Sequence, residues 1–143
     1  MIPNAASFIN QGYNPLSFSE GFDKHQVTEI MDLCKDLGEC PIVDEEKLEA
    51  YAIITAMGPT YLWPQLHQLH QLGLQFGLTE EEAASGIQNM LNGTKELLNQ
   101  TEINYDQVID LIPVKPMHEH IENLCKDYQS TLTGLYKKLK RAN

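Results

Sequence analysis

The five histidines are the residues whose chemistry could hold a metal ion. His67 and His70 lie three apart in a segment with helical periodicity, so they share a helix face at a spacing that metal ligands use. His118 and His120 stand two apart at the start of another predicted helix, where side chains point about 200° away from each other. Packed or solvent-facing histidines are therefore favoured over a metal site, and no metal ligands are predicted.

Nucleophilic and phosphate chemistry also lack a recognisable arrangement of residues. No GxGxxG or GxxxxGK[ST] pattern is present, so no pyrophosphate loop is predicted. Cys34 falls on the apolar face of its predicted helix, which favours packing over reactivity, and no serine lies in a nucleophile elbow. Glu45, Glu46 and Glu49 are interpreted as a solvated helix face. The catalytic residues stay unknown.

Composition excludes several classes of protein. The 143 residues carry a formal net charge of −10, which is unsuited to nucleic-acid binding because that binding relies on Lys and Arg. No apolar run is long enough to span a membrane, and residues 1–10 lack the features of a signal peptide. Three widely spaced cysteines, without CxxC spacing, indicate reduced thiols in a cytoplasm.

Basic residues gather at the C-terminal end, in a segment without acidic residues. We interpret them as the end of a helix, where cations suit the negative end of the dipole, and an anionic partner is the lesser alternative. These residues are Lys137, Lys138, Lys140 and Arg141.

The first 43 residues predict short elements separated by turns. Residues 16–18 and 40–43 are predicted strands. Between them a helix is predicted from an N-cap at Asp23 to Leu37, closed by Gly38. Two short strands form a marginal sheet alone, so this segment is expected to join a larger sheet.

The remaining residues predict helices. One runs from the acidic residues 44–46 to about Met57 and is broken by Gly58-Pro59. The next covers residues 60–76, with Pro64 in or near its first turn. Its apolar arc takes about half the circumference, which predicts packing on more than one side, either centrally or against a second subunit.

Three further helices follow. Thr79 and Glu82 form a capping box that opens a long helix. A short helix is predicted over residues 105–112, and a last one over residues 117–141. The sequence alone therefore predicts a mainly helical domain with excess apolar surface.

Several runs resemble the C-terminal part of the pyrroline-5-carboxylate reductase family. Residues 2–4, Ile-Pro-Asn, are similar to the family's Met-Pro-Asn. Residues 55–61, Thr-Ala-Met-Gly-Pro-Thr-Tyr, are similar to Ser-Gly-Ser-Gly-Pro-Ala-Tyr, and residues 72–83 are similar to the family's Ala-Gly-x-x-x-Gly-Leu-x-x-x-x-Ala. The resemblance covers most of residues 2–112 and fades in the last helix.

The resemblance implies a fold and an activity. In that family a Rossmann domain binds NAD(P)H, the C-terminal helices form an intertwined homodimer, and the product is proline. It implies a coenzyme-domain remnant, strand-helix-strand, over residues 1–43. Residues 44–143 would be an all-helical dimerisation domain like the C-terminal domain of 6-phosphogluconate dehydrogenase. It also places Asn4 on the cofactor side, and Gly58, Pro59, Tyr61 and Lys115 on the substrate side.

The chain departs from the family pattern in two ways. The Rossmann half is absent, so the chain is expected to be a fragment or a truncated gene product that is inactive and binds no cofactor by itself. The family's substrate loop, Ser-Pro-Gly-Gly-Thr-Thr, corresponds to residues 112–117, which read Ile-Pro-Val-Lys-Pro-Met. Lys115 could attract an acid, although a solvated loop lysine is favoured.

Two main hypotheses follow. The first is the dimerisation and substrate-side domain of a pyrroline-5-carboxylate-reductase-like, NAD(P)-dependent oxidoreductase, cytoplasmic and homodimeric, with no nucleic-acid or membrane partner. The alternative is a stand-alone helical interaction module without catalytic activity. A metal-dependent enzyme is a distant third.

Overall fold

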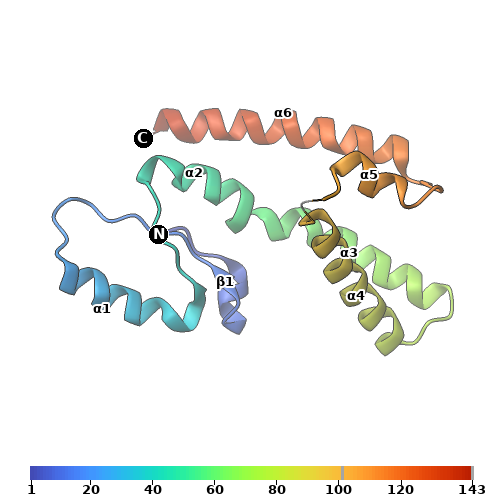
Figure 1. Ribbon diagram of the computed structural model, residues 1–143, viewed down its shortest axis with the longest axis horizontal. Helices are drawn as coiled ribbons and strands as arrows, with labels where there is room; N and C mark the ends of the chain where they lie inside the picture. Colours follow the sequence, from blue (N-terminus) through green and yellow to red (C-terminus); the bar gives the residue numbers. More distant parts are fainter. Residues whose placement is uncertain (101, 143) are drawn as a thin grey trace. The chain divides into compact units, whose positions relative to one another are not determined.

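The computed structural model describes residues 1–100 and 102–142 of a mainly helical chain with a small parallel sheet (Figure 1), as the fold prediction stated. Two compact units are present. The first comprises Met1–Tyr61 and Lys126–Asn143, and the second comprises Leu62–Cys125. The division predicted at residue 43 separates a coenzyme-domain remnant from a dimerisation domain. The two compact units do not test that division, and it stays a prediction. None of the described helices has the length and apolar character that crossing a membrane requires.

The sheet of the first unit consists of β1 (Gly12–Tyr13) and β2 (Gly38–Glu39), which pair in parallel with Gly12 opposite Gly38. The predicted strands at residues 16–18 and 40–43 are thus wrong in position, and only an isolated bridge joins Leu16 to Ile42 there. The cause is a close backbone approach. A Cβ on Gly38 would lie 2.3 Å from the Gly12 carbonyl oxygen, and Gly38 has a φ of +110°. Glycine alone suits both conditions.

The connection between the two strands agrees with the prediction. A 3₁₀ turn, η1 (Ala5–Ile9), precedes β1, and α1 (Lys24–Cys34) follows it. Asp23 caps α1 in a capping box with Gln26. A 3₁₀ turn, η2 (Lys35–Leu37), then ends at Gly38.

The helical part of the first unit begins with η3 (Glu45–Lys47), α2 (Leu48–Tyr51) and a π-helical turn, η4 (Ala52–Ala56). The end of α6 (His118–Ala142) belongs to the same unit. There the Lys140 ammonium lies 2.8 Å from Glu49 Oε2 and donates to the Glu46 carbonyl oxygen. This ion pair attaches the last turn of α6 to the start of α2.

The helix α3 (Gly58–Gln75) begins two residues earlier than predicted. Pro64, predicted in or near the first turn, is therefore the seventh residue of the helix. Pro59 occupies that first turn instead, where an amide has no helical partner to lose. The glycine-proline pair thus begins α3 as well as separating it from the preceding helix.

The second unit contains α3 from Leu62 onward, then α4 (Glu80–Leu98) after a short turn, and α5 (Tyr105–Asp110), which ends two residues before its predicted end. Gly77, with a φ of +97°, closes α3 as predicted. A Cβ on Gly73 would lie 3.2 Å from the Ala83 Cβ, so the two helices approach closely at these small residues. His70 Nε2 lies 3.2 Å from Glu80 Oε2 across the same turn.

The predicted capping box at the start of α4 is confirmed. The Glu82 amide donates to Thr79 Oγ1 at 3.2 Å, and the Thr79 amide donates to Glu82 Oε2 at 2.8 Å. The hydrogen bond from the Thr79 amide, followed by the Thr79 side chain, holds the pKa of the Glu82 carboxyl below its usual value. The bonded carboxylate therefore favours the folded state above the ordinary glutamate pKa, and that contribution is lost as the pH falls through the lowered value.

We expect Thr79→Ala to lower the free energy of unfolding by about 1 kcal/mol, because the first turn of α4 loses a side-chain acceptor. Urea denaturation of the two proteins measures this difference. The matched control is Thr79→Ser, which keeps the hydroxyl and should unfold within about 0.5 kcal/mol of the wild type. An alanine variant as stable as the serine variant would contradict the assignment.

Candidate functional site

The segment that resembles the family most closely, residues 55–61, lies at the junction between η4 and α3. The Met57 amide donates to the Ala52 carbonyl oxygen at 3.0 Å, which is the five-residue spacing of a π-helix. The Thr60 amide then donates to the Met57 carbonyl oxygen at 2.9 Å. Such π turns inside helices are frequent at functional sites. The predicted substrate-side residues Gly58, Pro59 and Tyr61 follow this irregular turn directly.

Tyr61 fastens this junction to the rest of the first unit. Its hydroxyl donates to the Ile53 carbonyl oxygen at 2.9 Å, and its ring lies 5.8 Å from the ring of Tyr128. Burial, followed by the nearby Tyr128, raises the pKa of the Tyr61 hydroxyl above its usual value. The hydroxyl therefore stays protonated and serves to position the start of α3.

Asn4, the predicted cofactor-side residue, is brought against the same segment. Its Nδ2 donates to the Thr55 carbonyl oxygen at 2.6 Å, while its Oδ1 accepts from the Ala6 amide at 2.9 Å. One N–H and one lone pair of the side-chain amide remain available. The structure thus places Asn4 beside the predicted substrate-side segment, 51 positions away in the sequence.

Asn14, which follows β1 directly, organises this arrangement. Asn14 is fully buried, with 0% of its surface exposed. Its Oδ1 accepts from the Asn4 amide at 2.8 Å and from the Ser7 hydroxyl at 2.9 Å, and its Nδ2 donates to the Leu37 carbonyl oxygen at 3.2 Å. Its role could not be read from the sequence, because the partners of its side chain lie 7 to 26 positions away.

Lys115, the last of the predicted substrate-side residues, belongs to the second unit. Its ammonium lies 2.8 Å from Asp110 Oδ1, so a carboxylate of the same segment already balances its charge. The surrounding loop exposes large apolar side chains, of which Val114 is 73% exposed. The others are Leu111, Ile112 and Met117.

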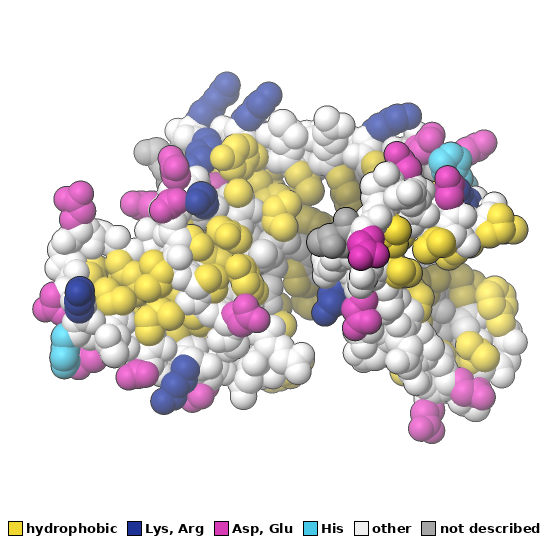
Figure 2. All heavy atoms as spheres, in the orientation of Figure 1, with side chains coloured by type: hydrophobic (Ala, Val, Ile, Leu, Met, Phe, Trp, Pro, Cys, Tyr) yellow, Lys and Arg dark blue, Asp and Glu magenta, His cyan; other side chains and the backbone are white. Residues whose placement is uncertain are grey.

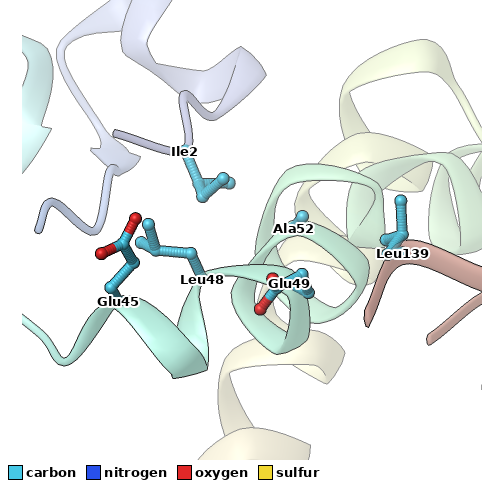
Figure 3. A pocket seen from close by; sticks show the side chains of 6 residues that line it. All are labelled: Ile2, Glu45, Leu48, Glu49, Ala52 and Leu139. Atoms are coloured by element: carbon cyan, nitrogen blue, oxygen red, sulfur yellow. The ribbon is translucent and has the colours of Figure 1, made fainter. Parts of the chain in front are cut away.

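A hollow of about 250 Å³ lies elsewhere in the first unit (Figure 3). The apolar side chains of Ile2, Leu48, Ala52 and Leu139 line it together with Glu45 and Glu49. It contains none of the predicted site residues. We therefore do not assign the hollow to the candidate site.

Three of the five histidines, His25, His70 and His118, each lie close to a glutamate carboxylate. His70 faces Glu80, and His118 Nε2 lies 3.4 Å from Glu122 Oε1. Within residues 1–100 and 102–142, no group of three His, Cys, Asp or Glu residues is arranged to hold a metal ion. The candidate site offers backbone carbonyls, amides and neutral hydroxyls as hydrogen-bonding groups.

We expect Tyr61→Phe to lower the free energy of unfolding by about 1 kcal/mol, because the Ile53 carbonyl loses its hydroxyl donor. The pH dependence gives a second readout. A raised tyrosine pKa favours folding below the ordinary value near 10, and this contribution is lost as the pH rises through the raised value. Urea titrations between pH 7 and 11 should therefore show a steeper loss above pH 10 in the wild type than in the variant. Identical profiles would contradict this role.

Comparison with known proteins tests the resemblance. No family model matches the chain. The pyrroline-5-carboxylate reductase of Staphylococcus aureus (strain COL) is 29% identical over 108 residues, which are 76% of this chain and 40% of that protein. The resemblance to pyrroline-5-carboxylate reductases is confirmed. The chain therefore spans about two fifths of the length of the curated relatives that it matches.

Solved structures agree on the fold. A pyrroline carboxylate reductase from Plasmodium falciparum with NADP bound superposes with a TM-score of 0.66 at 18% identity, over 95% of this chain and 57% of that one. A 1-pyrroline-5-carboxylate reductase from Streptococcus pyogenes gives a TM-score of 0.69 at 16% identity, over 95% of this chain and 54% of that one. At these identities the likeness establishes the mainly helical fold with its small β segment.

Proposed function

We propose that this chain is the dimerisation and substrate-side part of a pyrroline-5-carboxylate-reductase-like, NAD(P)-dependent oxidoreductase that reduces an imine. The observation that carries the proposal is how little of the apolar surface of the second unit is buried. Among the described residues of the second unit, Ala83 is the only one buried. A helical unit in water needs to cover its apolar faces, and a second copy of the chain would do so.

The exposed apolar residues follow a regular pattern on α3. Leu69 is 47% exposed and Phe76 is 79% exposed, and Leu62 is exposed as well. These three residues lie seven apart, which places them along one helix face. On the face of the molecule drawn in Figure 2, hydrophobic side chains are visible over both units. A continuous stripe of this kind suits helix-to-helix packing between two copies.

The coenzyme is proposed for the longer protein, by analogy with the NADP in the Plasmodium falciparum structure. The residues of this chain do not fit a complete dinucleotide site. The sequence has no glycine-rich phosphate turn, and one donor and one acceptor of the Asn4 side chain are already used. We therefore assign only Asn4 to the cofactor side and derive no step through the coenzyme. Inactivity of this chain alone stays a prediction.

The substrate side is proposed at the start of α3. Gly58, Pro59 and Tyr61 would line it, held in place by the contact from Asn4 to Thr55. Lys115 lies in the second unit and would bind an acidic substrate only by exchanging Asp110 for it. A cytoplasmic location, where cysteines stay reduced, is part of this proposal.

A specific observation favours the alternative of a helical interaction module without activity. The family's substrate loop is replaced by exposed apolar residues, including Ile112 and Val114. Such a loop suits contact with another protein better than binding of a polar imino acid.

Two measurements test the proposal. Sedimentation equilibrium at micromolar concentration should give the mass of a dimer, and a monomer would overturn the dimerisation role. Adding a separately produced coenzyme domain from a related reductase, with NADPH and pyrroline-5-carboxylate, should give turnover that the chain alone does not give. A dimer with no turnover in any combination would favour the interaction module.

A further inference from the structure

Two cysteines of the first unit lie against each other. Cys34 is the last residue of α1 and Cys40 follows β2. The Cys40 thiol donates to the Cys34 carbonyl oxygen at 3.5 Å, and Asn14 Nδ2 donates to Cys40 Sγ at 3.9 Å. Burial, and to a smaller extent the neighbouring Cys34, raises the pKa of the Cys40 thiol. Cys125 is exposed on α6, in the other unit.

We propose that Cys34 and Cys40 form a reversible oxidation site, a dithiol that closes to an intramolecular disulfide when the protein meets a hydroperoxide. The inference does not depend on the proposed function. It rests on the contact of the Cys40 thiol with residue Cys34, at the Cys34 carbonyl oxygen, and on the short loop that separates the two cysteines. The new disulfide would close a short loop that contains residues 35–39.

The chemistry balances with hydrogen peroxide as the oxidant. The Cys40 thiolate attacks one peroxide oxygen, the O–O bond breaks, and the other oxygen leaves as hydroxide and becomes water, so that Cys40 becomes a sulfenic acid. The Cys34 thiolate then attacks the Cys40 sulfur, and the sulfenic oxygen leaves as a second water. Two thiols and one peroxide thus give one disulfide and two waters.

The environment assigns the order of the two steps and their pH dependence. Cys34 is only 8% exposed, whereas Cys40 is half-buried, so Cys40 is the thiol that the peroxide reaches first. Burial raises the pKa of the Cys40 thiol, which keeps it protonated at neutral pH. Because the thiolate is the nucleophile, oxidation should be slow at pH 7 and should accelerate as the pH rises.

The enclosed loop connects the oxidation site to the candidate functional site. Leu37 lies within it, and the Leu37 carbonyl oxygen accepts from Asn14 Nδ2. Asn14 in turn accepts from the Asn4 amide, and Asn4 holds Thr55. A disulfide between Cys34 and Cys40 would therefore brace the loop on which the placement of Asn4 depends.

The experiment treats the full chain with hydrogen peroxide at pH 7 and pH 9, then unfolds it and alkylates the free thiols before peptide mass analysis. The expected product is about 2 Da lighter, carries a peptide pair linked through Cys34 and Cys40, and is alkylated at Cys125. The yield should be several-fold higher at pH 9 than at pH 7 after equal times. A thiol reductant should restore three alkylated cysteines.

Matched variants exclude other pairings. Cys125→Ser should oxidise as the wild type does, because the exposed thiol takes no part. Cys40→Ser should form no intramolecular disulfide. The proposal is overturned if Cys34 and Cys40 both remain open to alkylation after treatment, if they pass to sulfinic acid without linking, or if the only disulfides run through Cys125.

Discussion

Replacing Leu69 by glutamate should convert a dimer of this chain into a monomer. Leu69 lies on the exposed stripe formed by Leu62, Leu69 and, directly after the end of α3, Phe76, and 47% of its surface is exposed. If a second copy covers this stripe, the glutamate would be buried without a partner charge, which is strongly unfavourable. We expect the dissociation constant to rise at least about 100-fold. Sedimentation equilibrium over a range of micromolar concentrations measures the change.

The adjacent residue provides the control. Gln68 lies on the polar face of α3 and is exposed, so Gln68→Glu adds the same charge to the same helix away from the stripe. This variant should associate as the wild type does. If both variants dissociate, net charge rather than the apolar stripe governs association. If neither does, α3 is not the interface.

Replacing Asn14 by alanine should have the largest effect on stability. The substitution removes the partner of the Asn4 amide, the Ser7 hydroxyl and the Leu37 carbonyl, at a residue with no exposed surface. A buried polar group left without a partner costs about 1–3 kcal/mol. We expect the free energy of unfolding to fall by about 3–5 kcal/mol, partly offset by entry of water.

Urea denaturation measures this change, and Asn89→Ala is its control. Asn89 is exposed on α4 and bonds only within its own helix, to Ser85. Its loss should change the free energy of unfolding by no more than about 0.5 kcal/mol. An Asn14 variant as mild as the Asn89 variant would show that the buried network contributes little.

The features that were predicted correctly depend on neighbours in the chain. The N-caps at Asp23 and Thr79 and the helix ends at Gly38 and Gly77 each involve residues within one or two turns. A single sequence contains such signals in full. The last helix was also predicted within one residue at each end. Its apolar residues recur at helical spacing over a long segment, which makes the signal strong.

The features that were missed depend on distant partners. The register of β1 and β2 follows from two glycines 26 positions apart, and alternation of residues 16–18 could not reveal it. The π turn before Gly58 and the position of Pro64 inside α3 depend on how the preceding helix ends. The same holds for the candidate site. Gly58, Pro59 and Tyr61 were found through resemblance, whereas the role of Asn14 required the three-dimensional contacts.

The scarcity of buried side chains has a consequence for calorimetry. Among the described residues only Pro15, Leu16, Cys34, Ile53 and Ala83 have buried apolar side chains. The heat-capacity increment of unfolding scales with the apolar area that becomes hydrated, about 12–15 cal/mol/K per residue in ordinary domains. A monomer of this chain should therefore show a much smaller heat-capacity increment of unfolding per residue. If a second copy covers the apolar helices, the rest of the heat-capacity change should accompany dissociation of the dimer.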